Sequence, residues 1–365
     1  MQKIFQGIEH LEQSLNGCHK VLLVCDSSFR FLNIRNEIEN ISIPYIIFDG
    51  FSSNPLYEDV CKGVDLFHSE GCDSILAVGG GSSIDVAKCI KLFSKMSKER
   101  LYLNQDFQDT GVKLIAIPTT AGTGSESTRY AVIYYDGKKQ SITHDSIIPN
   151  VAILEPKVLS SLPLYQKKCT MLDALCQGIE SWWSVNSTEK SKKLSKEAVK
   201  TIIYWWREYI FENSEEASEQ MMKAANLSGQ AICITQTTAP HAFSYKLTSM
   251  FHLPHGHAVA ICLPEIWDYM INNMVFCVDE RGADYVMKTF GQIARALGGY
   301  NLEDGIEQFR LMLDAMEIDH PISSDIVEDL NILSTSVNPI RLRNNPISFD
   351  EEGIRMVYEN VVWSE

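Results

Sequence analysis

Histidines gather in one short stretch in the second half of the chain. Four of its nine histidines fall within seventeen residues, at His241, His252, His255 and His257. Imidazole is the commonest metal-binding side chain, so this cluster favours a metal site over four separate structural histidines. Asp173 is a candidate ligand because it lies on the apolar face of an expected helix, although an exposed or capping acid fits the same pattern. Such a site would polarise an alcohol or aldehyde oxygen.

A glycine-rich loop follows one of the apolar runs in the first half. The run Ile75–Val78 precedes this loop, and an expected helix, Ile84–Phe93, follows it. The loop itself consists of Gly79, Gly80, Gly81, Ser82 and Ser83. Glycines let the backbone approach a bulky anion, and serines and free N–H groups at a helix start favour a phosphate. A tight strand–helix turn would leave the same pattern, so this loop alone does not decide between the two interpretations.

Two further strand ends carry polar side chains. The run Leu114–Pro118 leads into a loop rich in hydroxyl groups, and the run Val21–Val24 extends to Asp26. The candidate hydroxyl side chains are Thr119, Thr120, Thr123 and Ser125. Because open parallel sheets bind ligands at the carboxyl ends of their strands, three such ends favour a dinucleotide. The carboxylate of Asp26 would accept hydrogen bonds from ribose hydroxyls and repel a 2′-phosphate, which predicts NAD(H) as the cofactor, with NADP(H) as the alternative. Asp26 could equally be a turn residue without a role in binding.

The elements that must position these residues differ between the two halves. Short apolar runs alternate with amphipathic stretches in the first half, which predicts a parallel sheet covered on both faces. The expected strands are Val21–Val24, Tyr45–Phe48, Ile75–Val78 and Leu114–Ile117. After Ser160 helical patterns dominate, at Tyr165–Val185, Ser187–Phe211, Glu216–Thr235, Pro240–Met250, His257–Met274, Asp279–Ala296, Leu302–Met316 and Glu351–Val361. The sequence therefore predicts an α/β fold, with a dinucleotide-binding parallel-sheet domain at residues 1–158 and an all-helical metal-binding domain at residues 159–365.

Composition and charge exclude several classes of protein. The chain is 45% hydrophobic and 22% charged, which is typical of a globular protein with large cores. Its net charge of −15 argues against general nucleic-acid binding. We find no signal peptide and no stretch of ~18 apolar residues, and the ten cysteines form no C-x-x-C pair. We therefore expect a cytoplasmic protein that binds neither nucleic acid nor membrane, with a homodimer as one option for its assembly.

Four sequence motifs together resemble one known family. They are the loop at residues 79–88, GGGSSIDVAK; the loop at 118–126, PTTAGTGSE; the triplet Asp173-Ala174-Leu175; and the turn Pro254-His255-Gly256, with His241 fourteen residues before His255. Over essentially its whole length the chain resembles the iron-containing (group III) metal-dependent alcohol dehydrogenases. The resemblance implies an N-terminal dinucleotide domain and a C-terminal helical domain.

The resemblance also implies roles for individual residues. Asp173, His241 and His255 match metal ligands, which implies one divalent ion, zinc or iron. Asp26 matches a position that contacts the adenosine ribose, Asp85 belongs to the pyrophosphate loop, and Lys139 matches a lysine near the cofactor. The implied activity is hydride transfer between a nicotinamide cofactor and a primary alcohol or aldehyde.

Two positions depart from the family pattern. Gln177 stands where relatives have a fourth metal-binding histidine, and Tyr245 stands where they have another histidine one turn after His241. Gln177 is four residues after Asp173, so we expect it on the same side of the helix, close to the metal but weakly bound or water-bridged. Tyr245 or a water chain would then move the proton; a packed helix residue is the other interpretation of Tyr245.

The resemblance leaves the substrate open between two anionic compounds. Residues 172–177 and 183–188 look most like reductases of phosphonoacetaldehyde, and the alternative is oxidation of the C8 alcohol of a 3-deoxy-octulosonate. Candidate cations for either anion are Arg129, Lys246, Arg341 and Arg343, although a solvated surface role is the default for each. A non-catalytic nucleotide- or metal-binding relative is the alternative of another class, and the change at Gln177 is the feature that favours it.

Overall fold

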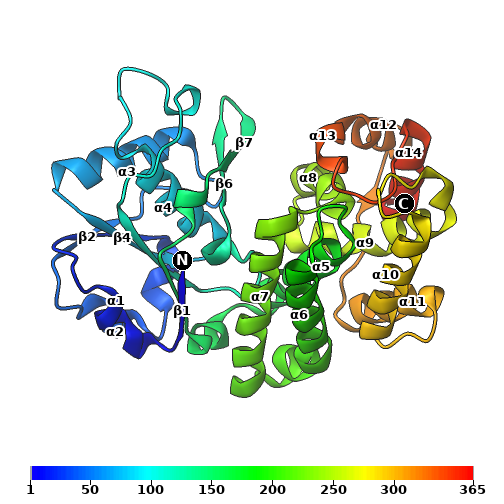
Figure 1. Ribbon diagram of the computed structural model, residues 1–365, viewed down its shortest axis with the longest axis horizontal. Helices are drawn as coiled ribbons and strands as arrows, with labels where there is room; N and C mark the ends of the chain where they lie inside the picture. The colour runs from blue at the N-terminus through cyan, green and yellow to red at the C-terminus, as the bar shows by residue number, and fades with distance from the viewer. Residues whose placement is uncertain (1, 365) are drawn as a thin grey trace. The chain divides into compact units, whose positions relative to one another are not determined.

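The computed structural model describes residues 2–364, whose contacts form two compact units (Figure 1). The first unit comprises the chain up to Pro163 together with Asn213–Gly229, and the second comprises Leu164–Glu212 and the chain from Gln230 onward. The first unit thus includes a segment that the sequence interpretation assigned to the helical half. The segment belongs to the first unit because it packs closely there: a Cβ on Gly124, whose φ is +60°, would lie 2.9 Å from the backbone nitrogen of Gly229.

A six-stranded parallel sheet forms the centre of the first unit. Its order is β1 (Lys3–Gln6), β8 (Val151–Leu154), β5 (Lys113–Pro118), β4 (Ser74–Gly79), β2 (Val21–Cys25) and β3 (Tyr45–Phe48). Every residue of β2, β4 and β8 is buried, as expected for apolar strands covered on both faces. The four predicted strands are confirmed. Two strands were not predicted: β1 is largely exposed and has no apolar run, whereas β8 is a buried apolar run that the sequence interpretation missed.

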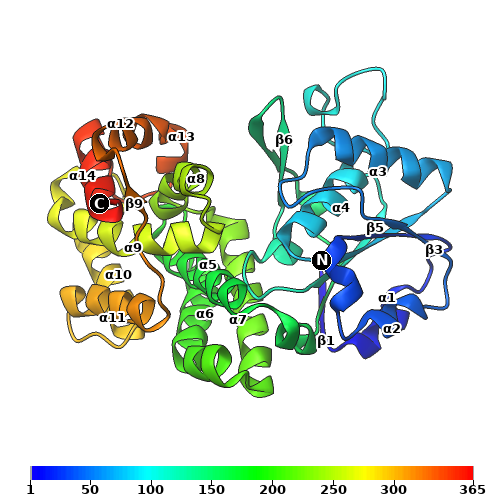
Figure 2. The same cartoon turned by 180° about the vertical axis from the view of Figure 1, so that it is seen from behind.

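Helices cover both faces of this sheet. Figures 1 and 2 show α3 (Tyr57–Ser69) and α4 (Gly81–Phe93) on one side, and the short helices α1 (Leu11–Ser14) and α2 (Arg35–Glu39) on the other. An antiparallel hairpin, which the sequence interpretation missed, packs on α4. Its strands are β6 (Tyr130–Tyr135) and β7 (Lys138–Thr143). The turn between them uses Asp136 and Gly137, both at positive φ, the conformation that this hairpin turn requires.

The second unit is helical, apart from a short parallel pair formed by β9 (Ile322–Ser323) and β10 (Trp363–Ser364). Its helices are α5 (Leu164–Trp183), α6 (Glu189–Arg207), α8 (Ala239–Phe251), α9 (His255–Asn272), α10 (Ala283–Ala296), α11 (Leu302–Ala315), α12 (Ile326–Ser336), α13 (Pro339–Leu342) and α14 (Glu351–Val361). Helix α7 (Glu215–Thr235) begins in the first unit and ends in the second. The eight predicted helices are confirmed, with ends that shift by several residues. Among the described residues, no helix combines the length and apolarity needed to cross a bilayer.

Helix α5 is the central helix of the second unit. It packs against α6 and α9, and it is buried from Met171 to Trp183. A helix that is surrounded on all sides is expected to have apolar residues on every face, so polar residues within it are unusual. Asp173, Gln177 and Glu180 are spaced four and three residues apart, and this spacing places them on one face of the helix. Helix α5 therefore presents three buried polar side chains along a single line.

Candidate functional site

The two loops that the sequence singled out lie side by side in the first unit. Strand β4 ends at Gly79, whose carbonyl accepts a hydrogen bond of 3.0 Å from the backbone N–H of Thr119. Helix α4 begins at Gly81, where an added Cβ would lie 2.9 Å from Cγ2 of Thr123. A Cβ on Gly80 would lie 3.6 Å from Thr120. The glycines therefore keep open the edge of the sheet where the free N–H groups of α4 begin, an arrangement suited to phosphates.

Asp26 reaches the first of these loops from the neighbouring strand. It follows β2, and its carboxylate accepts hydrogen bonds from Ser28 N at 2.7 Å and from Ser83 Oγ at 3.0 Å. A Cβ on Gly79 would lie 3.4 Å from Asp26 Oδ2. The three strand ends singled out in the sequence thus converge on one edge of the sheet. Their role in cofactor binding stays a prediction.

Asp85 and Ser125 serve the architecture of the two loops. Ser125 Oγ donates to Asp85 Oδ1 at 2.7 Å, and Val132 N donates to Asp85 Oδ2 at 2.9 Å. Lys88 is fully buried and donates to Ser125 Oγ at 2.9 Å, to Thr128 Oγ1 at 3.1 Å and to a backbone carbonyl. Burial raises the pKa of Asp85, although the positive charge of Lys88 and its hydrogen bonds oppose this rise. Both carboxylate oxygens of Asp85 therefore fasten the second loop and the hairpin to α4.

Two other predicted cofactor residues lie near these loops. Ser82 is in the first turn of α4 and donates a hydrogen bond of 2.5 Å to the carbonyl of Ser53. Lys139 lies on β7. Burial is the largest influence on the pKa of Asp85 and raises it; Lys88 and two hydrogen bonds oppose this rise, and the positive charge of Lys139 opposes it more weakly. Cofactor contacts of Ser82 and Lys139 also stay predictions.

Three predicted metal ligands converge in the second unit. Asp173 is on α5, His241 is in the first turn of α8, and His255 is the first residue of α9. Each offers one ligand atom, and these atoms lie within 4.8 Å of one another. Asp173 and His241 are buried, with His241 Nε2 3.3 Å from Asp173 Oδ1. Two donor atoms each about 2.1 Å from a tetrahedral ion lie roughly 3.4 Å apart, so this pair fits a divalent metal.

Gly256 explains how His255 comes so close to Asp173. A Cβ on Gly256 would lie 2.8 Å from the carbonyl carbon of Cys169 and 3.0 Å from Cβ of Asp173. Only a glycine lets the start of α9 approach the backbone of α5 this closely. The Pro254-His255-Gly256 turn thus places the imidazole of His255 beside the carboxylate of α5. The same turn was recognised in the sequence, but its close contact with α5 was not.

Glu180 completes the cluster, and the sequence interpretation missed it. Its Oε1 lies 2.5 Å from Nδ1 of His241, while its Oε2 accepts hydrogen bonds from Thr238 N at 2.7 Å and Thr238 Oγ1 at 3.1 Å. A carboxylate on the outer nitrogen fixes the orientation of a metal-binding imidazole, leaving Nε2 for the metal. Thr238 is the N-cap of α8, so one fully buried carboxylate holds both the helix start and His241. The spacing of Asp173 and Glu180 on α5 was the available signal.

The charges of this cluster depend strongly on one another. Burial alone would lower the pKa of His241, but the carboxylates of Glu180 and Asp173 outweigh it and raise this pKa to about 9. Burial would raise the pKa of Asp173, but the hydrogen bond from His241 and the charge of His255 lower it. The cluster therefore favours positive charge between its carboxylates. A divalent cation held by Asp173, His241 and His255 would supply that charge in place of the imidazole proton.

Gln177 lies beside Asp173, as its spacing predicted. Its amide nitrogen donates a hydrogen bond of 3.1 Å to Asp173 Oδ1, the same oxygen that faces His241. In this orientation the amide of Gln177 holds the carboxylate in place. Whether its oxygen also ligates the metal stays a prediction.

The other two histidines of the sequence cluster lie elsewhere. His257 bonds the hydroxyl of Tyr165 at 2.8 Å through Nδ1 and the carbonyl of Asp319 at 2.7 Å through Nε2. His252 ends α8 as an exposed residue with φ of +54°. His257 therefore ties α5 to a distant loop of the same unit, and His252 terminates a helix.

Tyr245 lies next to the predicted metal ligands, one turn after His241 on α8. Its ring stacks on the ring of His255, with centroids 5.8 Å apart and planes within 4° of parallel. Arg341 donates from Nη1 to the hydroxyl of Tyr245 at 3.3 Å. Tyr245 thus contacts both His255, a predicted metal ligand, and the guanidinium of Arg341, and its role in proton transfer stays a prediction.

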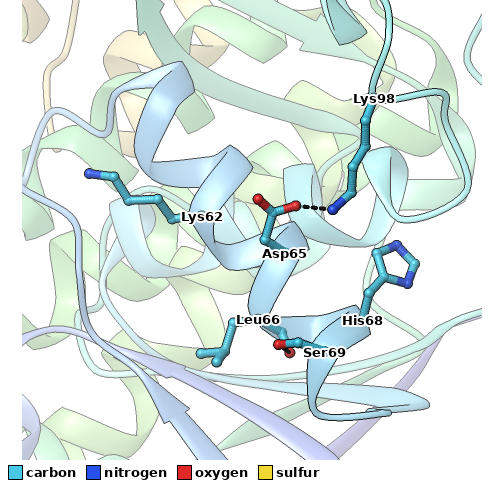
Figure 3. A pocket seen from close by; sticks show the side chains of 6 residues that line it. All are labelled: Lys62, Asp65, Leu66, His68, Ser69 and Lys98. Carbon is cyan, nitrogen blue, oxygen red and sulfur yellow. Dashed lines mark hydrogen bonds and ion pairs between the residues drawn. The ribbon is translucent and has the colours of Figure 1, made fainter.

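A surface hollow of about 620 Å³ lies on the first unit, away from the predicted loops (Figure 3). Its six lining residues come from α3 and from the chain after α4: Lys62, Asp65, Leu66, His68, Ser69 and Lys98. Figure 3 shows an ion pair between Asp65 and Lys98 across it. The hollow is open and shares no residue with the candidate site.

The sheet with two glycine-rich loops and the helical unit with an Asp/His/His cluster define a class, the metal-dependent nicotinamide dehydrogenases. Family models agree. Residues 2–156 match the model for iron-containing alcohol dehydrogenase, and residues 168–362 match the C-terminal model of the Fe-containing alcohol dehydrogenase family. The chain belongs to the iron-containing alcohol dehydrogenases, oxidoreductases that use NAD(P) and one metal ion. This membership decides against a non-catalytic relative.

Individual relatives place the chain within this family. It is 30% identical over 305 residues to the phosphonoacetaldehyde reductase of Streptomyces viridochromogenes, a match covering 77% of this chain and 74% of that protein. It is 36% identical over 298 residues to aldehyde-alcohol dehydrogenase 2 of Entamoeba histolytica, covering 73% of this chain but 33% of that longer protein. Sulfoacetaldehyde reductase from Bifidobacterium kashiwanohense in complex with NAD+ has a TM-score of 0.87 at 24% identity, covering 99% of this chain and 96% of that chain, which shows the shared fold.

Proposed function

We propose that the protein reduces a small anionic aldehyde, phosphonoacetaldehyde, to 2-hydroxyethylphosphonate with NADH. The convergence of Asp173, His241 and His255 in a chain of this family is the observation that carries the proposal. The choice of aldehyde rests on the 30% identity to a phosphonoacetaldehyde reductase. When bound, the metal polarises the aldehyde oxygen and the nicotinamide supplies a hydride.

The side chains of this cluster have distinct tasks in the proposed reaction. Asp173, His241 and His255 hold the metal. Glu180 orients His241 through Nδ1, and Gln177 orients Asp173 through its amide nitrogen. Because these orienting hydrogen bonds are buried, the ligands are already arranged before a metal arrives, which lowers the cost of binding it.

Tyr245 is the side chain proposed to pass the proton that the product alcohol requires. Its ring stacks on His255, and its hydroxyl bonds Arg341. A hydroxyl is both donor and acceptor, so it can deliver a proton itself or connect to a water chain. Replacement of Tyr245 by Phe should lower kcat and change its pH profile; unchanged kcat and pH profile would exclude the relay.

The proposed cofactor is NADH, and the proposed setting is the cytoplasm. Asp26 lies beside Gly79, where its carboxylate would accept ribose hydroxyls and repel a 2′-phosphate. All ten cysteines are free thiols, which fits a reducing compartment. We further propose that the protein binds neither nucleic acid nor membrane, and that a homodimer is an option for its assembly.

A substrate screen tests this function. The purified protein, loaded with zinc or iron, is assayed with NADH and phosphonoacetaldehyde, sulfoacetaldehyde, propanal and butanal, and with NAD+ and a 3-deoxy-octulosonate. We expect the highest kcat/KM with phosphonoacetaldehyde. Equal or faster turnover of the neutral aldehydes would contradict an anionic substrate, and preferential oxidation of the sugar acid would replace the proposed reaction.

A further inference from the structure

One of the candidate cations lies next to the metal ligands in the second unit. Arg341, on α13, donates to the hydroxyl of Tyr245, and its guanidinium carbon lies 5.1 Å from the centre of the Tyr245 ring. That ring is stacked on His255. Figures 1 and 2 show α13 beside α8, and the two helices are in contact. Arg341 is therefore one aromatic side chain away from a predicted metal ligand.

The surroundings of Arg341 differ from those of the other candidates. Arg129 pairs with Asp145 at 3.2 Å. Arg343 is exposed, and Lys246 projects about 100° around α8 from Tyr245. Arg341 is half-buried. It is not among the arginines that form ion pairs within residues 2–364, which are Arg35, Arg129, Arg281, Arg310 and Arg355. The half-buried guanidinium of Arg341 thus has a hydroxyl group as its printed hydrogen-bond partner, whereas Arg129 has a carboxylate.

We propose that Arg341, held by Tyr245, is the subsite that binds the anionic group of the substrate, a phosphonate or the closely similar sulfonate. A guanidinium presents a planar fork of N–H donors that matches two oxygens of such a group. The contact with Tyr245 engages Nη1 on one side of this fork and orients the remainder. This assignment rests on the proposed reduction of an anionic aldehyde and adds the residue that would select it.

The first experiment compares selectivity, measured as kcat/KM with phosphonoacetaldehyde divided by kcat/KM with propanal. In Arg341→Gln this ratio should fall roughly 10- to 100-fold, the usual worth of a charge-assisted hydrogen bond. Arg341→Lys keeps the positive charge but lacks the planar pair of N–H donors, so its selectivity ratio should lie between those of wild type and Arg341→Gln. Arg343→Gln, a matched loss of charge two residues away, should stay within about twofold of wild type. A ratio in Arg341→Gln equal to that in Arg343→Gln would overturn the assignment.

A binding measurement separates this inference from the proposed function. Methylphosphonate is titrated into the metal-loaded, NADH-saturated protein and its affinity is measured by calorimetry. The affinity should fall in Arg341→Gln, should fall less in Tyr245→Phe, and should hold in Arg343→Gln, even if phosphonoacetaldehyde is no substrate. Equal methylphosphonate affinity in wild type and Arg341→Gln would overturn the subsite while leaving the proposed reduction standing.

Discussion

Each unit of this protein holds a cluster of largely buried polar and ionisable side chains, but the two clusters are built differently. In the first unit, Lys88 bonds three oxygens and Asp85 accepts two hydrogen bonds. In the second unit, Asp173, His241 and His255 direct their ligand atoms toward one another, and Glu180 holds His241 from outside. The first arrangement uses its hydrogen bonds to fasten the second loop and the hairpin to α4. The second converges on a common point, which is the geometry of a metal site.

The largest expected effect comes from removing a ligand of the second cluster. His255→Ala should reduce bound metal from one per chain to nearly none and abolish turnover, because two remaining donors are too few for a stable site. Gln177→Ala should largely spare the metal. Elemental analysis of both reconstituted variants makes the comparison, and equal metal loss would make Gln177 a full ligand.

A matched change in the first cluster should affect stability and leave the metal in place. Lys88→Met leaves three oxygens, those of the Ser125 and Thr128 hydroxyls and one backbone carbonyl, without their buried donor, which should lower the free energy of unfolding by about 1–3 kcal/mol. Urea denaturation measures this loss. Metal content should remain at one per chain; a variant that loses its metal but not its stability would contradict the division between the two clusters.

Glu180→Gln tests the support of His241. The variant keeps the side-chain shape but removes the charge that fixes the imidazole, so the affinity for zinc should fall roughly 10- to 100-fold. Competition with a chromogenic chelator measures that affinity. Glu265→Gln removes an acid from α9 that pairs with Arg310, and it serves as the control. Equal affinity in the two variants would show that Glu180 has no role in metal binding.

The smallest expected effect concerns cofactor choice. Asp26→Asn keeps the cap at the end of β2 but removes its charge, so the ratio of kcat/KM with NADPH to that with NADH should rise on the order of tenfold. Asp59→Asn, a loss of charge on α3, should leave the ratio unchanged. Wild-type protein that already prefers NADPH would refute the role of Asp26.

Sequence patterns predicted the parts of this molecule that depend on local order. Buried strands such as Val21–Val24 and Ile75–Val78 stand out as apolar runs, and the loops that follow them stand out as glycine and hydroxyl clusters. The β6–β7 hairpin was missed although Asp136-Gly137 marks its turn. Residues 213–229 belong to the first unit, which was missed because helical periodicity does not show which unit a helix packs in.

In the candidate site too, sequence patterns identified candidate residues but not the long-range contacts that determine their roles. Four neighbouring histidines looked equivalent in sequence, yet His257 is bonded through both ring nitrogens to other parts of its unit. Which imidazoles point at Asp173 depends on the contact of Gly256 with α5, a long-range feature. Glu180 shared the face of Asp173 on α5, but its importance follows from its distance to His241, which no spacing reveals.

We propose that one divalent metal binds where Asp173, His241 and His255 converge. Anomalous diffraction from crystals of the zinc-reconstituted protein tests it most directly. We expect one strong peak about 2.0–2.2 Å from Asp173 Oδ1, His241 Nε2 and a ring nitrogen of His255. A peak at other residues, or none at this cluster after reconstitution, would contradict it.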